Sequence, residues 1–172
     1  MPALALFGIS IIFSFVAWGI LTAHFIWPEL RDRSHVDALR PLLTLHAFRF
    51  IGLSFLIPGV VSPNLPAAFA VSAAYGDIVA AILALLSLAA IRSSVGIPLV
   101  WVFNIWGSAD LLNAFYRANV AGLLPGELGA AFYIPTAIVP LLLITHALMF
   151  RLLLRLEPAA DSLSAKRFGG LE

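Results

Sequence analysis

Residues 3–27 read ALALFGISIIFSFVAWGILTAHFIW, an apolar run without Asp, Glu, Lys or Arg. A helix of about 20 apolar residues is enough to cross the hydrocarbon core of a bilayer. Residues 1–10 lack the basic residues that open a cleavable signal peptide, and the run is long enough to span. We therefore expect a retained transmembrane helix here, ended by Pro28 and the polar segment 29–40.

Four further runs of the same character follow along the chain, at about residues 41–62, 70–91, 97–117 and 130–154. Pro41 and Pro98 suit first helical turns, where the missing N–H has no helical partner to lose. The expected fold class is all-α, a polytopic bundle of five transmembrane helices. It forms one domain over residues 1–156, followed by a short polar tail at 157–172.

The composition of the whole chain indicates that lipid is its main solvent. Of the 172 residues, 62% are hydrophobic and 11% are charged, and the mean hydropathy is +1.02. Soluble domains carry about 25% charged residues, and one small globule cannot hide this much apolar surface. A net charge of +1 gives no indication of nucleic acid as a partner. The absence of cysteine excludes disulfides, Cys-ligated zinc, iron–sulfur clusters and thiol catalysis.

The distribution of cations predicts the orientation. With five spans, eight of the ten Lys and Arg residues fall on one side, Arg117 falls on the other, and Arg49 lies within a span. Cytoplasmic loops carry an excess of cations, so the Arg-rich side is expected to be cytoplasmic. This places the N-terminus outside and the C-terminus in the cytoplasm, in the inner membrane of a bacterial-type cell.

Three histidines are predicted at nearly the same depth, roughly 6–8 Å inside the cytoplasmic boundary by the helical rise. They are His24, His46 and His146, and Arg49 shares a helix face with His46 because it follows three residues later. Ionisable groups inside spans are costly and commonly mark a site. Two imidazoles could ligate haem b, or three could hold a divalent metal, with Arg49 paired to an anionic group. Alternatively, each histidine only hydrogen-bonds a neighbouring helix.

A second constellation is predicted in the outer half, where Asp77 and Asp110 lie roughly 8–12 Å below the boundary. Two carboxylates in a low-dielectric site suit general acid–base chemistry, a proton relay or cation binding. Asp110 also belongs to a helical stripe at spacings of four, three and four residues. The other candidates here are Trp106, Asn113, Tyr116 and Arg117. The structural alternative is a salt bridge from Asp77 or Asp110 to Arg117.

These residues favour an intramembrane protein that binds a small molecule or cofactor (haem or metal), with redox activity as one form, through the histidines. One alternative is an enzyme acting on a lipid or apolar substrate through Asp77 and Asp110. Others are a proton or solute transport subunit, which would need a homo-oligomer, and an accessory subunit without chemistry. The expected partners are the bilayer and a small apolar ligand. Segments 45–52 (LHAFRFIG) and 106–110 (WGSAD) are where a family signature is expected.

Overall fold

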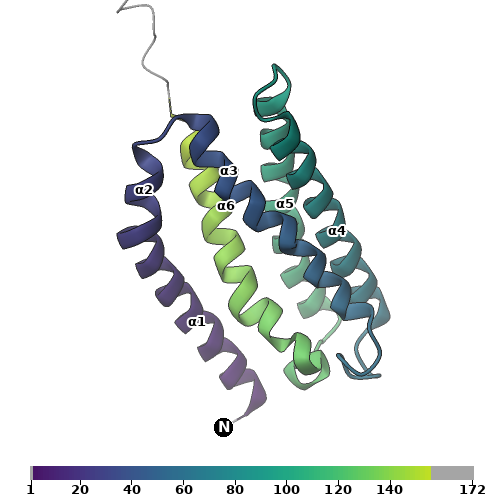
Figure 1. The fold of residues 1–172 in the computed structure, drawn as a ribbon. Helices are drawn as coiled ribbons and strands as arrows, with labels where there is room; N and C mark the ends of the chain where they lie inside the picture. Colours follow the sequence, from purple (N-terminus) through teal and green to yellow (C-terminus); the bar gives the residue numbers. More distant parts are fainter. Residues whose placement is uncertain (1, 156–172) are drawn as a thin grey trace, which may run out of the picture.

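The computed structural model describes residues 2–155, which form an all-α bundle (Figure 1). The predicted tail at 157–172 lies outside the described residues. The chain begins with α1 (Ala3–Leu21), the π-helical turn η1 (Thr22–Ile26) and α2 (Trp27–Arg31). Next come α3 (His35–Ala47) and the 3₁₀ helix η2 (Phe48–Leu56), then α4 (Ala67–Ala90) and α5 (Gly96–Val120). The 3₁₀ segment η3 (Pro125–Phe132), the π-helical turn η4 (Ile134–Ile138) and α6 (Val139–Leu153) complete it.

Four helical stretches are long and apolar enough to cross a membrane: Ala3–Arg31, His35–Leu56, Ala67–Ala90 and Ile134–Leu153. The bundle is therefore of the membrane type that the sequence predicts. Helix α5 has 25 residues but is more polar, and it is not among these four.

The second of these stretches begins at His35, six residues before the predicted start at Pro41. The Ser34 hydroxyl caps it, accepting a hydrogen bond from the backbone N–H of Asp37 at 3.2 Å and donating one to its carboxylate at 2.8 Å. Pro41 consequently lies inside α3, and η2 ends at Leu56 rather than at residue 62. The earlier start moves the residues that follow about 9 Å farther from the helix end than predicted, at 1.5 Å per residue.

Both π-helical turns lie beside prolines. Pro28 lies two residues after the end of η1, and Pro140 lies two residues after the end of η4. Proline has no backbone N–H, so the carbonyl four residues earlier loses its helical partner, and a wider turn accommodates the break. The indole N–H of Trp18 donates to the carbonyl of Ala137 in η4 at 3.0 Å. This hydrogen bond joins α1 to α6 through the second π-helical turn.

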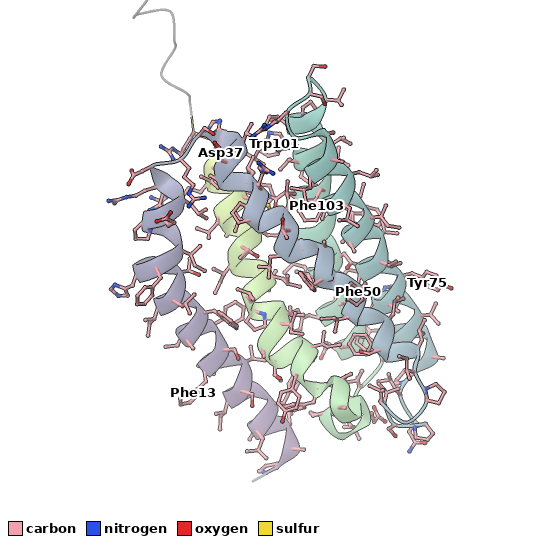
Figure 2. All side chains as sticks on the ribbon, viewed as in Figure 1. Phe13, Asp37, Phe50, Tyr75, Trp101 and Phe103 are labelled. Atoms are coloured by element: carbon pink, nitrogen blue, oxygen red, sulfur yellow. The ribbon has the colours of Figure 1, made fainter. Side chains whose placement is uncertain are left out.

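Helix α1 lies at the edge of the bundle beside α6, while α3 crosses the front and α4 and α5 form the other side (Figure 1). No residue of α1 is buried. Figure 2 shows Phe13 on the outer side of α1 and Tyr75 on the outer side of α4, and these side chains are 71% and 60% exposed. In a bilayer, such large apolar faces contact lipid.

Two apolar clusters fill the bundle, here called the upper and lower clusters from their positions in Figure 1. The upper cluster includes Leu39, Leu43, Phe103 and Met149, all fully buried. The lower cluster contains, among others, Phe55, Phe69, Leu111, Leu128 and Ile134. The buried side chains between the two clusters are polar, so the core is apolar at both ends and polar in the middle.

Candidate functional site

Buried or partly buried polar side chains separate the upper from the lower cluster, and we call them the polar layer. They come from α3 with η2, from α4, from α5 and from α6. None comes from α1. The members are His46, Arg49, Asp77, Asn104, Asp110, Thr145 and His146. The histidine and carboxylate constellations that the sequence placed at separate depths therefore form one network.

Arg49 is the centre of this network and is only 3% exposed. Its Nε donates to Asp77 Oδ1 at 2.8 Å, and its Nη2 donates to Asp110 Oδ2 at 2.7 Å. Its Nη1 donates to the Gly107 carbonyl at 3.1 Å. The local helix type explains the position, because side chains three residues apart eclipse one another in a 3₁₀ helix. Arg49, Gly52 and Phe55 accordingly form the buried row of η2.

The two histidines lie above Arg49 and are held by different partners. Asn104 Nδ2 donates to the His146 carbonyl at 3.3 Å, which orients the amide so that its oxygen accepts from His146 Nδ1–H at 2.6 Å. His146 Nε2 then faces Arg49 Nη1 at 3.5 Å as an acceptor. The Thr145 hydroxyl donates to backbone carbonyls of its own helix, so it accepts from His46 Nε2–H at 3.0 Å. His46 Nδ1 is buried without a hydrogen-bond partner.

Three glycines make room for the charged groups of the layer. A Cβ atom at Gly52 would lie less than 3.0 Å from the Asp77 carboxylate, and one at Gly76 would lie equally close to the Asp110 carboxylate. A Cβ at Gly107 would lie 2.6 Å from His146 Cε1 and 2.9 Å from Arg49 Nη1. Each glycine thus permits a close approach between a backbone and a side chain that any other residue would obstruct.

A cavity of about 270 Å³ lies on the lower side of the polar layer. Most of its wall is apolar, including Phe55, Phe69, Leu111 and Phe115, and α1 contributes Phe7. Asp77 and Asp110 also belong to the wall. The volume falls between that of a 150 Å³ apolar cavity, which accommodates benzene, and the roughly 300–1,000 Å³ of drug-sized pockets.

The charges of the layer are unequal, since two carboxylates share one guanidinium. Each carboxylate uses one oxygen for Arg49. Over residues 2–155, the other oxygen of each has no hydrogen-bond donor: Asp77 Oδ2 lies against Gly52 and Asp110 Oδ1 against Gly76. Within the described residues, neither of these two oxygens is fully enclosed, so both remain accessible.

A second, outer hollow of about 480 Å³ lies between α4 and α5 on the outside of the bundle. We call it the lateral hollow. Its lining includes Tyr75 and Gly76 from α4 and Trp106, Asp110 and Asn113 from α5. Asp110 is the side chain that borders both this hollow and the internal cavity.

The structure brings together two of the three predicted histidines. His46 and His146 are buried with ring centroids 4.2 Å apart, whereas His24 is exposed on η1. Equal depth did not imply equal facing, because η1 directs His24 away from the bundle. The described residues contain no group of three His, Asp or Glu side chains placed to hold a metal ion. The expected three-histidine metal set is therefore corrected to a histidine pair.

The close contact between the two imidazole rings also bears on haem. A metal between two imidazoles takes metal–nitrogen distances of roughly 2 Å on each side, which separates the ring centroids by about 6 Å. The observed separation is 4.2 Å, and Phe103 contacts both rings with centroids 5.2 and 5.4 Å away. Haem ligation by His46 and His146 would require these rings to move apart, and it gains no support from this arrangement.

The alternative of a salt bridge from Asp77 or Asp110 to Arg117 is wrong, because both carboxylates pair with Arg49 instead. The earlier start of α3 explains why Arg49 takes the place of Arg117 as the partner. It puts Arg49 deeper in the bundle, at the level of Asp77 and Asp110. The other candidates predicted near Asp110 also face outward. Trp106, Asn113, Tyr116 and Arg117 are all exposed, and only the first two border the lateral hollow.

Sequence reasoning missed Asn104 and the three glycines as parts of the site. The segments 45–52 and 106–110, where a family signature was expected, do contribute to the site. They supply His46, Arg49, Gly52, Gly107 and Asp110.

Residues 6–154 match the family described as Domain of unknown function (DUF8737). No curated protein and no solved structure matches the chain.

Proposed function

Since the chain belongs to this family of unknown function, DUF8737, we propose its activity from the geometry of its own site. The protein binds a small, mainly apolar molecule that carries one positive charge, in the cavity below the polar layer. The observation that carries this proposal is the pair of carboxylates, sharing one guanidinium, in the wall of an otherwise apolar cavity.

The charge balance supports a cation. If all three groups are ionised, Arg49 offsets one of the two carboxylates and one negative charge remains in excess. An uncompensated charge away from water is strongly unfavourable, so the site favours a proton or a bound cation. A ligand amine in the cavity would reach the free oxygen of Asp77, which accepts no hydrogen bond from residues 2–155. Its apolar body would contact the aromatic and aliphatic wall.

The packing of the upper cluster supports ligand binding rather than conduction of protons or solutes. A conducting path from the carboxylates would have to continue through the upper cluster. There, Leu39, Leu43, Phe103 and Met149 are fully buried and close-packed. The polar network consequently ends at the histidine pair. A polar network that does not continue into the upper half fits a binding protein better than a proton or solute transport subunit.

We also propose that α5 is a fifth span, with the N-terminus outside and the C-terminus in the cytoplasm of a bacterial-type inner membrane. At 1.5 Å per residue, its 25 residues extend about 37 Å, which is enough to cross a bilayer. It lies alongside α4, and its polar Asn104 and Asp110 turn into the polar layer. The N-terminus and the end of α6 lie at opposite ends of the bundle (Figure 1), as an odd number of spans requires.

The binding proposal is tested with 4-fluorophenethylamine and its uncharged isostere 4-fluoropropylbenzene. Purified protein in nanodiscs is titrated with each compound, and ¹⁹F NMR reports binding above that to protein-free nanodiscs. The amine is expected to bind at least about tenfold more tightly, in line with a charge-assisted hydrogen bond. Asp77→Asn should remove this preference. Equal binding of both compounds, or no binding of either, would overturn the proposal.

A matched pair of variants locates the binding. Ala114→Phe places a ring in the cavity wall, whereas Ala89→Phe adds the same ring on an exposed part of α4 that lines neither the cavity nor the lateral hollow. We expect Ala114→Phe to abolish binding of the amine and Ala89→Phe to leave it unchanged. Equal affinities in the two variants would show that the amine binds elsewhere.

The cysteine-free sequence makes the topology directly testable. Single cysteines are introduced at Asn64, Ser94 and Ala121, which are exposed in connections between helices. In intact cells, a membrane-impermeant maleimide should label the variants Asn64→Cys and Ala121→Cys. Ser94→Cys should react only after lysis. Labelling of Ser94→Cys and Ala121→Cys from the same side would exclude α5 as a span.

A further inference from the structure

The lateral hollow has a composition that lipid contact does not explain. Helix faces that meet acyl chains are apolar, and polar groups there are costly. Yet the wall of this hollow includes Ser72, Asn113 and the carboxylate of Asp110. Asp110 is partly buried, with 13% of its side chain exposed. The hollow therefore presents a carboxylate at its floor to molecules that approach from the side.

The two oxygens of Asp110 differ in their surroundings. Oδ2 accepts from Arg49 inside the bundle at 2.7 Å. Oδ1 lies against Gly76, a residue that lines the lateral hollow, and it accepts no hydrogen bond from residues 2–155. The glycine matters here because a Cβ at that position would lie less than 3.0 Å from the carboxylate. The Asp110 carboxylate thus directs one oxygen to Arg49 and the other toward the hollow.

Two aromatic side chains line the same hollow as Asp110. Tyr75 on α4 is 60% exposed and Trp106 on α5 is 48% exposed. Figure 2 shows Tyr75 projecting from the outer side of α4. Aromatic faces attract cations, and Trp does so most strongly. A hollow lined by a carboxylate and two exposed aromatic rings is a suitable environment for an ammonium group.

We infer that the lateral hollow is a second binding site, and that it takes the ammonium head of a single-chain lipophilic amine from the membrane. The head donates to Asp110 Oδ1 between Tyr75 and Trp106. The chain extends along the apolar surface beside Val79, which also lines the hollow. This site differs from the cavity in its ligand, because a long chain exceeds a volume of about 270 Å³. It does not depend on binding in the cavity.

The test compares 12-fluorododecylamine with 12-fluorododecanol in nanodiscs of phosphatidylcholine, again by ¹⁹F NMR and relative to protein-free nanodiscs. The amine should show binding to the protein beyond its partitioning into lipid, and the alcohol should show at least about tenfold less. Asp110→Asn should reduce the affinity for the amine about tenfold or more. Equal behaviour of the two compounds would overturn the inference.

Aromatic variants keep the inference falsifiable even if Asp110→Asn fails to fold. Trp106→Leu and Tyr75→Leu should each weaken binding of the amine by about threefold to tenfold. Tyr116→Leu is the matched control, because Tyr116 is an exposed aromatic residue of α5 that does not line the hollow. If Trp106→Leu and Tyr75→Leu bind the amine as tightly as Tyr116→Leu, the site is not in the lateral hollow.

The cavity variant separates this inference from the proposed function. Ala114→Phe should abolish binding of 4-fluorophenethylamine and leave binding of 12-fluorododecylamine unchanged. Trp106→Leu should have the opposite pattern. Loss of the long-chain amine in Ala114→Phe would place it in the cavity and overturn the lateral site, while the cavity proposal would stand.

Discussion

The upper and lower halves of the bundle share α4, α5 and α6, but side chains fill the upper half and leave a cavity in the lower one. The polar layer lies between them and differs on its two sides. The histidines adjoin the packed half, where His46 and His146 contact Phe103. The carboxylates adjoin the cavity. The histidines and the carboxylates are all costly to bury. What distinguishes them is that only the carboxylates border a cavity that a ligand could enter.

Arg49 holds the two halves together, and its removal should have the largest effect. Arg49→Met leaves two buried carboxylates without their cation, which should reduce the free energy of unfolding by about 3–5 kcal/mol. The measurement is the unfolding midpoint in mixed micelles. Arg117→Met removes the same charge from an exposed position and should change stability by less than about 0.5 kcal/mol.

A compensated variant sharpens this result. Adding Asp77→Asn and Asp110→Asn to Arg49→Met removes the unpaired charges, so part of the lost stability should return. If Arg49→Met is as stable as Arg117→Met, the guanidinium does not hold the carboxylates in place.

The close approach of α4 to α5 gives the next largest effect. Gly76→Ala forces the Asp110 carboxylate to move, and overpacking of this kind costs about 1–3 kcal/mol. Gly19→Ala is the control, since nothing lies within 4 Å of a Cβ at Gly19 and alanine favours helix more than glycine. Thermal unfolding should show opposite signs for the two variants. A stabilising effect of Gly76→Ala would contradict the observed packing.

The comparison of halves predicts that the histidines contribute to stability but not to binding. His146→Leu keeps a similar volume but deprives Asn104 and Arg49 of a partner, which should cost about 1–2 kcal/mol. The affinity for 4-fluorophenethylamine should stay within about twofold of wild type, because His146 does not line the cavity. Retained stability together with lost binding would reverse the roles assigned to the two sides of the layer.

Sequence patterns predicted the membrane-type helical bundle. They also singled out Asp77, Asp110, His46 and Arg49, which the structure brings together in the polar layer. Hydrophobic runs of about 20 residues indicate the bundle, and the cost of placing charge inside a membrane draws attention to these polar residues. The start of α3 at His35 was missed because Ser34 caps a polar turn that resembles a loop. That error placed Arg49 beside the histidines alone and left Arg117 as the alternative partner considered for the carboxylates.

The facing of side chains could not be predicted from depth. A helix position fixes how far a residue lies from the boundary, but the direction depends on which neighbours pack against it. Thus His24 and the stripe residues Trp106, Asn113 and Arg117 face outward, whereas Asn104 faces His146. The 3₁₀ geometry of η2 is a further tertiary effect, since it aligns Arg49 with Gly52 at a spacing of three residues.

The smallest predicted effect concerns α1, which adds to the cavity wall without being buried itself. Trp18→Phe removes the hydrogen bond to the Ala137 carbonyl and should cost about 0.5–1.5 kcal/mol. Phe13→Leu changes an outward-facing ring and should be neutral. Because α1 contributes Phe7 to the wall, looser attachment should also speed the exchange of 4-fluorophenethylamine in ¹⁹F NMR. Unchanged stability and exchange in Trp18→Phe would mean that the other helices alone define the cavity.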